Sequence, residues 1–197
     1  MVVVMNDDLA EERIQHGIPL VREQGVWHGL AADKVLPWAP AGVAPLAPEA
    51  ASFAAVGWGG QVVVAAGAES RREGLERRDG EVAVPRAARL IDGAIHTAGL
   101  RRQVFRRSGE GRWNAIDQGV AASAPDPPVG FNAIDGFSTD EIYAVGLDGE
   151  IWTRGGGIWR KLAAPTNVHL HCLCCAANGK AYAGGRNGVL LEGRGDS

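Results

Sequence analysis

Short apolar runs separated by glycine-containing turns fill the chain from residue 52 onward. Runs such as residues 61–66 are rich in valine and alanine, and their brevity and composition are typical of β-strands rather than helices. Asp148-Gly149 and Asn187-Gly188 are hairpin signals, because a tight two-residue turn needs positive φ at both positions. This part of the chain is therefore predicted to be all-β, with closely spaced strands.

The segment before residue 52 has a different pattern. Asn6 is placed to cap a helix, acidic residues follow it, and apolar residues then recur at helical spacing, which predicts one short helix over residues 6–16. Four prolines stand among alanines in residues 36–51, where they predict an extended connector rather than a strand or helix. We therefore divide the chain into an N-terminal segment, residues 1–51, and a β domain, residues 52–197.

The β domain repeats itself along the sequence. Residues 142–152 are echoed 39 residues later without a gap, residues 95–105 precede them by 47 residues, and a weaker copy spans residues 63–80. Four short strands per unit, at a period of about 40–50 residues, are typical of a propeller blade. The fold class predicted is all-β, a small β-propeller-like array of about four short-stranded blades, residues 52–85, 86–127, 128–166 and 167–197.

Two sets of side chains recur at fixed places in these units. Small residues such as Ala144 and Ala183 occupy the second strand, and we expect them in the crowded space near the propeller axis. Trp113 and Trp159 lie 46 residues apart. They are expected to fill the wider space between neighbouring sheets.

A family resemblance rests on residues 132–165. They carry the arrangement I-x-G-x-S-x-D-x-I-Y-A-V-G-x-x-G-x-I-W-x-x-x-G-G-x-W, which resembles the repeats of bacterial propellers of the BNR/Asp-box type, including photosystem II assembly factor-like repeats. Asp148, Gly149 and Trp152 match only the D-G and W parts of the strict Asp-box. Such propellers include glycosidases, assembly factors and binding modules, so the resemblance implies a fold and leaves the function open.

The fourth unit stops where its last strand is due, although a propeller needs to close on itself. One hypothesis is that residues 17–37, which include Val26-Trp27-His28, supply the missing outer strand as a circular clasp. The alternative is an open array whose free edge pairs with another copy of the chain or with another protein.

Composition and charge limit the classes of partner and the cellular compartment that we expect for this chain. With 20 basic and 23 acidic residues the net charge is −3, which gives no electrostatic reason to expect nucleic acid or an acidic membrane as a partner. The apolar opening of five residues has no basic residue before it, unlike a signal peptide or a membrane span. Three cysteines within residues 172–175 cannot build a spaced disulfide framework. We expect a cytoplasmic protein.

Eleven of the 20 basic residues lie between Arg71 and Arg112, where six acids are interleaved and the net charge is +5. One interpretation is a set of solvated outer strands, on which alternating charge is common. The other is a docking surface for an acidic protein, since arginine suits bidentate contacts to carboxylates. The candidate partner-binding residues are Arg71, Arg72, Arg77, Arg78, Arg101, Arg102, Arg106 and Arg107.

A cluster of histidines and cysteines gives weak metal-ligand candidates, namely His169, His171, Cys172 and Cys174. Imidazoles and thiols can hold zinc or copper. In a strand, however, the two histidines point to one face and the two cysteines to the other. We therefore favour buried core packing for this strand and predict no metal and no cofactor.

Five acids gather in the third unit, Asp135, Asp140, Glu141, Asp148 and Glu150. A glycosidase needs two carboxylates flanking its sugar site, but each of these acids also has a local role in a loop or turn. We favour a non-enzymatic, protein-binding propeller of a bacterium, acting as a scaffold, an assembly factor or an inhibitor of the immunity type. The alternative function is a sialidase-like propeller that processes or binds glycans.

Overall fold

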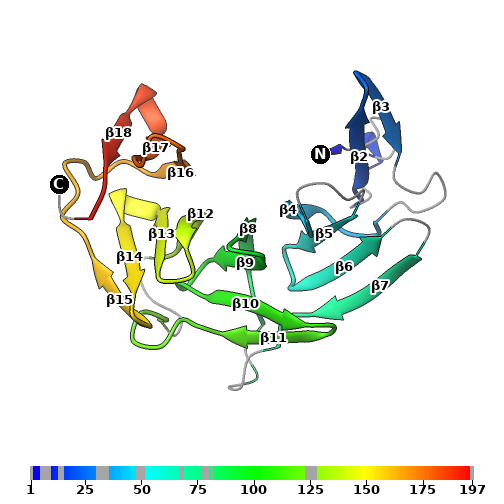
Figure 1. The fold of residues 1–197 in the computed structure, drawn as a ribbon, viewed down its shortest axis with the longest axis horizontal. Coiled ribbons are helices and arrows are strands. Elements are labelled where there is room, and N and C mark those ends of the chain that lie inside the picture. The colour runs from blue at the N-terminus through cyan, green and yellow to red at the C-terminus, as the bar shows by residue number, and fades with distance from the viewer. Residues whose placement is uncertain are drawn as a thin grey trace.

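The computed structural model describes residues 2–4, 10–12, 16–29, 36–47, 52–66, 69–76, 80, 82–122 and 128–195. These residues form five antiparallel sheets that follow one another around an open arc (Figure 1). The first sheet consists of β1 (Val2–Val4), β2 (Ile18–Glu23) and β3 (Val26–Gly29). Within the described residues, no helix is long and apolar enough to cross a membrane.

The second, third and fourth sheets have four strands each, paired in chain order. The second sheet contains β4 (Pro40–Pro45), β5 (Ser52–Gly57), β6 (Gln61–Ala66) and β7 (Glu69–Gly74). The third contains β8 (Pro85–Ile91), β9 (Ala94–Gly99), β10 (Val104–Gly109) and β11 (Arg112–Ala115). The fourth contains β12 (Phe131–Ser138), β13 (Glu141–Gly146), β14 (Ile151–Gly155) and β15 (Ile158–Lys161).

The fifth sheet has only three strands, β16 (Leu170–Cys175), β17 (Ala181–Gly185) and β18 (Leu190–Gly193). The first strands of neighbouring sheets, β4, β8, β12 and β16, pack against one another on the inside of the arc, and β7, β11 and β15 lie on its outside (Figure 1). The second strand of each sheet is therefore not the innermost, which corrects the predicted place of Ala144 and Ala183 near the axis.

The sequence repeat is a repeat of strand register. Ala144 pairs with Trp152, and 39 residues later Ala183 pairs with Leu191. The irregularity that separates Phe131 from Ala133 recurs between Leu170 and Cys172. The fourth and fifth sheets are thus two copies of one blade, of which the second has three strands among the described residues.

The turns predicted from Asp148-Gly149 and Asn187-Gly188 have the expected backbone. Asp148 and Gly149 have φ of 51° and 71°, and Asn187 and Gly188 have φ of 59° and 73°. They lie in single turns of 3-10 helix, η1 (Leu147–Gly149) and η2 (Arg186–Gly188). Gly and Asn or Asp are favoured there because they tolerate left-handed conformations at little cost.

The repeated glycine at the end of each second strand has a steric cause. A Cβ on Gly146 would lie 1.8 Å from the carbonyl oxygen of Gly130, and one on Gly99 would lie 2.0 Å from that of Val84. The backbone leading into the first strand of the sheet passes too close for any side chain. The glycine in the A-V-G motif is therefore required by close backbone approach, not by φ.

Two predictions about the N-terminal segment differ from the structure, and a third lies mostly outside the described residues. Of the helix expected over residues 6–16 the structure describes only 10–12 and 16, with 10 and 11 helical, so that expectation is not confirmed. The predicted connector over 36–51 contains β4, which pairs with β5 as the first strand of the second sheet. Its prolines, Pro40 and Pro45, are tolerated because β4 is an edge strand of that sheet.

The strand pairing does not support the circular clasp either. Of residues 17–37, β2 and β3 pair with each other and with β1, and Gly17 pairs with Leu36. None of the described strands pairs with the outer edge of β18, and the first and fifth sheets stand at opposite ends of the arc (Figure 1). The segment satisfies its backbone groups locally, which leaves the array open.

Apolar side chains hold neighbouring sheets together, as predicted for the tryptophans. Trp159 on β15 is 7% exposed and packs in a buried cluster with Val104 and Phe131, between the third and fourth sheets. Trp113 on β11 packs against the cluster between the second and third sheets, which includes Phe105. The core is thus a series of layers between sheets rather than one central mass.

A buried histidine in this core makes stability depend on pH. His96 on β9 is fully buried; its Nδ1 lies 3.0 Å from the carbonyl oxygen of Ala94, and its Nε2 has no hydrogen-bond partner. Burial, helped by the nearby charges of Arg106 and Arg154, lowers the pKa of His96 to about 4, although the hydrogen bond to Ala94 and the charge of Asp92 oppose the shift.

We expect the free energy of unfolding to fall as the pH is lowered from about 6.5 toward 4, because only the unfolded chain takes up the His96 proton there. The slope is at most about 1.4 kcal/mol per pH unit for one proton. Urea unfolding between pH 7 and pH 5 checks this, with His96→Gln expected to flatten the slope. The control is His171→Gln at an exposed position; an equal effect of both variants would contradict the assignment.

Candidate partner-binding site

Three of the eight candidate arginines join neighbouring sheets. Arg107 donates from Nε and Nη2 to the carboxylate of Glu73, at 3.0 and 2.6 Å. Arg102 donates from Nε to Glu150 at 2.8 Å, and Arg71 pairs with Glu110. These side chains are therefore engaged within the protein, in ion pairs that connect the second, third and fourth sheets.

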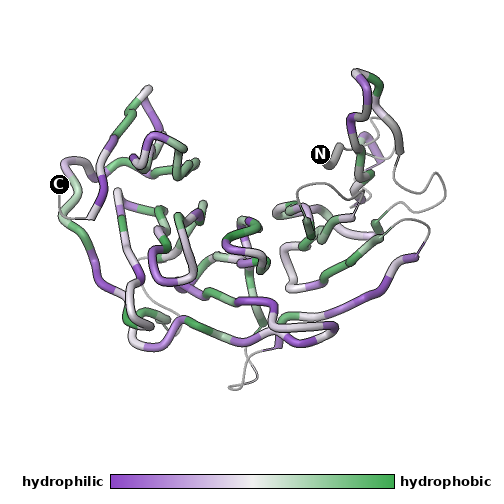
Figure 2. The backbone as a smooth tube through the Cα atoms, viewed as in Figure 1, coloured by the Kyte–Doolittle hydropathy of each residue, from purple (hydrophilic) through white to green (hydrophobic). Residues whose placement is uncertain are grey.

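The other candidates are placed differently. Arg72 is exposed on β7, a strand whose hydrophilic character on the outside of the arc is visible in Figure 2. Arg101 has φ of 58°, and its amide donates to the carbonyl of Val129; Arg106 is half-buried on β10. Arg77 and Arg78 lie outside the described residues. The structure does not gather the eight arginines into one patch, and contact with an acidic partner stays a prediction.

The acids of the fourth sheet also have structural partners. Asp135 is buried, accepts two hydrogen bonds of 3.1 Å from Arg89 on the third sheet and one of 2.9 Å from the amide of Cys175. Glu150 is held by Arg102, and Glu141 accepts hydrogen bonds of 2.8 and 2.6 Å from Arg194. The hydrogen bonds from Arg194 hold the pKa of Glu141 below its usual range. Each of these carboxylates bridges two sheets.

The histidine and cysteine cluster lies on and just before β16, as predicted, but the cysteines do not pack in a core. Cys172 and Cys174 are exposed and Cys175 is half-buried. The fifth sheet is the last of the described arc, so no further sheet covers the face on which Cys172 and Cys174 lie. The described residues contain no group of three or more His, Cys, Asp or Glu arranged to hold a metal ion.

One of the two histidines, His169, bonds the η1 turn of the fourth sheet. The Nδ1 atom of His169 accepts a hydrogen bond of 3.0 Å from the amide of Asp148, and His171 is exposed. The ring centroids of His169 and His171 are 6.4 Å apart, and the ring planes meet at an angle of 88°.

Burial raises the pKa of the Cys175 thiol to about 12, with the charge of Asp135 adding to the effect, so this thiol is not a reactive thiolate at neutral pH.

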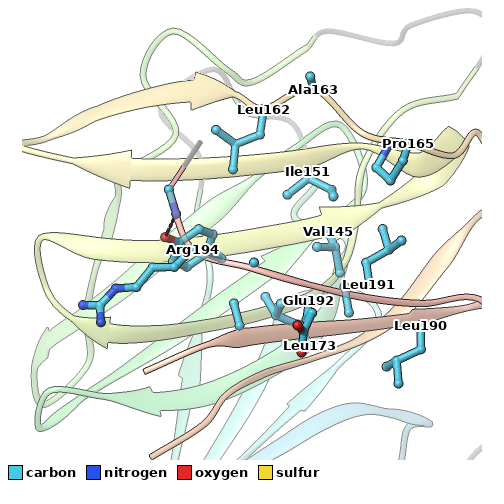
Figure 3. Close-up of a pocket in the computed structure, with 15 residues that line it drawn as sticks. Val145, Ile151, Leu162, Ala163, Pro165, Leu173, Leu190, Leu191, Glu192 and Arg194 are labelled. Atoms are coloured by element: carbon cyan, nitrogen blue, oxygen red, sulfur yellow. Dashed lines mark hydrogen bonds between the residues drawn. The ribbon is translucent and has the colours of Figure 1, made fainter. Parts of the chain in front are cut away.

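An apolar cavity of about 560 Å³ lies between the fourth and fifth sheets, on the side where the fifth sheet lacks a strand (Figure 3). We call it the terminal slot. The side chains of the fourth sheet and the loop after it form one wall, and those of the fifth sheet form the other. The apolar lining residues are Val145, Ile151, Leu162, Ala163 and Pro165 on the first wall and Leu173, Ala181, Ala183, Leu190 and Leu191 on the second.

The two residues that follow β18, Arg194 and Gly195, fix one end of the slot. Arg194 reaches Glu141 and lies 4.4 Å above the centre of the Phe137 ring. The amide of Gly195 donates to the hydroxyl of Tyr143 at 2.8 Å (Figure 3). The two walls are therefore connected at this end, and the slot is a formed hollow rather than a gap between two loose sheets.

The slot has the composition of a site for an apolar side chain and not of a hydrolytic site. Its lining contains one carboxylate, Glu192, which is paired with Lys180 at 2.8 Å. Leu190, which lines the slot from β18, is 70% exposed. No sequence pattern predicted this site; only the packed sheets show that the layer between the fourth and fifth sheets is hollow.

Comparisons with known proteins agree with this fold. The chain is 39% identical, over 99% of its length, to a protein named Immune protein Tsi7 from Pseudomonas aeruginosa strain PAO1. It spans 65% of the length of that relative, slightly under two thirds. No family model matches the chain.

Solved structures with a similar fold are β-propellers and share little sequence with the chain. The computationally designed Ika8 protein has a TM-score of 0.64 at 15% identity, covering 98% of this chain and 57% of that one. YCF48 bound to a D1 peptide has a TM-score of 0.60 at 15% identity, covering 93% and 61%. The designed Ika4 protein has a TM-score of 0.56 at 15% identity, covering 79% and 91%. These likenesses show a β-propeller-like fold, without establishing the Asp-box type of repeat.

Proposed function

We propose that this chain is an immunity-type protein: it binds a protein toxin in the bacterial cytoplasm and blocks it without catalysing a reaction. The observation that carries the proposal is the 39% identity, along nearly the whole chain, to a protein named as an immune protein. Such identity extends over all five sheets and includes the repeat that forms the fold.

The arrangement of polar groups supports binding rather than catalysis. Asp135, Glu141 and Glu150 are each engaged by an arginine from a neighbouring sheet, so the sheets are held in fixed relation to one another. A rigid array of this kind can dock onto another protein with little ordering cost. Glycan hydrolysis would instead need two convergent carboxylates.

A genetic competition tests the proposal without knowledge of the toxin. Deleting the gene in its own strain should make the deletion strain susceptible to killing by its parent in contact co-culture, because the parent still makes the toxin. Recovered deletion cells should fall relative to parent cells, and a plasmid copy of the gene should restore equal survival.

The control plasmid carries the same gene with an early stop codon, which separates the protein from any effect of the vector. Equal survival of the deletion strain and its parent, under conditions in which the parent kills an unrelated strain, would overturn the proposal.

A further inference from the structure

We propose that Trp58 and Arg86 are the central contacts of a docking surface for the toxin, and that the toxin places a carboxylate side chain against them. We call these two residues, together with Val82, the Trp58 patch. The inference rests on the proposed function for the class of partner. The patch belongs to the second and third sheets, each of which has a neighbouring sheet on both sides (Figure 1).

The side chain of Trp58 is exposed and yet held in place. It lies in the turn between β5 and β6 and is 46% exposed. Its indole Nε1 donates a hydrogen bond of 3.2 Å to the carbonyl oxygen of Pro40, and the guanidinium of Arg86 lies 4.3 Å from the centre of its ring. A ring that is fixed before binding loses little conformational entropy when a partner covers it, as is typical of interface anchors.

The tryptophan is not part of the repeat that builds the fold. The equivalent turns of the third, fourth and fifth sheets, residues 100–103, 147–149 and 186–188, contain no aromatic side chain. These turns form without one, so the turn itself does not require Trp58. Tryptophan is enriched where proteins contact each other, and we therefore assign this exposed ring to an intermolecular contact.

The segment that leads into β8 is held between the two sheets. The side chain of Gln103 is buried; its Oε1 accepts a hydrogen bond of 2.9 Å from the amide of Val84, and its Nε2 donates one of 3.4 Å to the carbonyl of Val82. On the other side, a Cβ on Gly60 would lie 3.2 Å from the Cβ of Ala83. Val82 is nevertheless 64% exposed, so a fixed backbone presents an apolar side chain to solvent.

Arg86 leaves its own sheet to reach the tryptophan. The pairing of β8 with β9 shifts between Pro85 and Ala87, and Arg86 stands in this irregularity. Bulges of this kind redirect a side chain away from the regular alternation of a strand. The guanidinium of the third sheet thereby lies over the exposed ring of the second sheet.

The charge of Arg86 indicates the chemistry of the partner. Other arginines that reach a neighbouring sheet are paired with an acid there, namely Arg107 with Glu73, Arg102 with Glu150 and Arg89 with Asp135. No carboxylate in the part of the chain that the structure describes pairs with Arg86, and its Nε is buried without a hydrogen-bond partner. A guanidinium stacked on an aromatic ring still binds a carboxylate through two hydrogen bonds. An acidic side chain beside an apolar one, on the toxin, fits the patch.

Protection of the deletion strain by variant genes tests the patch. Each gene is expressed from a titratable promoter, and the comparison starts from the lowest protein level at which the unmodified gene restores survival. Trp58→Ala should need at least about 30-fold more protein for the same survival, which is the effect on affinity of removing a hot-spot side chain. The matched control is Trp27→Ala, 49% exposed on β3, which should protect at the same level as the unmodified gene.

Variants of Arg86 test the charge of the partner. Arg86→Glu should need more protein than Arg86→Ala, because a glutamate repels the carboxylate of the toxin whereas alanine only removes the contact. Arg72→Glu makes the same change of charge at an exposed position of β7 and should protect like the unmodified chain. Immunoblots measure the protein levels, and melting curves of the purified variants show which are folded.

A third position keeps the test independent of folding. Val82→Asp changes the most exposed side chain of the patch, places a negative charge where the toxin is expected to be acidic, and should also weaken protection. A folding defect in one variant therefore leaves the other positions to decide.

Three outcomes overturn the inference. If the unmodified gene protects and the folded patch variants protect at the same level, the toxin docks elsewhere and the immunity function stands. If Arg86→Ala needs as much protein as Arg86→Glu, the contact is not acidic. A dimer of the chain in sedimentation experiments that Trp58→Ala dissociates would make the partner a second copy. If the unmodified gene itself does not protect, the proposed function fails and the docking of a toxin fails with it.

Discussion

Replacing Trp159 with alanine should lower the free energy of unfolding by about 3–5 kcal/mol, which is the usual cost of truncating a buried tryptophan. The side chain is 7% exposed, stacks on Phe131 and donates its N–H to the carbonyl of Ile116. Its loss leaves a cavity between the third and fourth sheets. Urea unfolding followed by circular dichroism measures the change.

A matched control is Trp27→Ala on β3, where the side chain is 49% exposed. Surface truncations away from a packed core stay within about 0.5 kcal/mol. If the two variants lost similar stability, Trp159 would not be the residue that joins the third and fourth sheets.

Replacing Glu73 with alanine should destabilise the protein by about 3–5 kcal/mol, because removing one partner of a buried ion pair leaves the other charge unpaired. The Glu73 side chain is fully buried. Besides the two hydrogen bonds from Arg107, it accepts one from the amide of Gly111 at 3.0 Å and one from the indole of Trp113 at 2.8 Å. One carboxylate thus satisfies donors from three places on the third sheet.

Glu110→Ala is the control for Glu73→Ala, since Glu110 pairs with Arg71 across the same two sheets but both side chains are more than half exposed. Exposed pairs contribute about 0–1 kcal/mol, so this variant should unfold close to the unmodified chain. Equal losses would show that inter-sheet charge pairing matters regardless of burial.

The pH dependence of the free energy of unfolding, compared between the unmodified chain and Glu73→Ala, gives a second test of the Glu73 ion pair. Burial alone would raise the pKa of Glu73, but the hydrogen bonds from Arg107, Gly111 and Trp113 outweigh it and hold the pKa below its usual range. A lowered pKa contributes stability above the unfolded value, and this stability is lost as the pH falls through the folded one. Glu73→Ala should therefore reduce the loss of stability on acidification below about pH 4.5.

Features that depend on near neighbours in the chain could be predicted from the sequence. The 39-residue repeat became an identical strand register, and the Asp-Gly and Asn-Gly pairs adopted positive φ because those residues alone reach it cheaply. The placement of Trp113 and Trp159 between sheets followed from their size and their fixed place in each unit. These are local preferences repeated often enough to define a fold.

The clasp and the connector could not be predicted, because both depend on which strand edges meet. Residues 36–51 resemble a linker in composition, yet Pro40–Pro45 adds an inner strand whose free edge tolerates proline. Residues 17–37 satisfy their own backbone hydrogen bonds in the first sheet instead of reaching β18. Such choices are set by competition between distant edges, which no local pattern records.

The sequence by itself determined the repeat, the strands, their turns and the residues that fill the layers between sheets. Only the tertiary structure decided that three of the eight candidate arginines are bound to acids on the next sheet, that Cys172 and Cys174 are exposed, and that the layer between the fourth and fifth sheets is hollow. The physical reason is that a side chain becomes buried only when two sheets pack face to face, and a local sequence pattern describes only one of them. The same side chain is buried against a neighbouring sheet, or exposed to solvent, according to whether another sheet packs on that face of its own sheet.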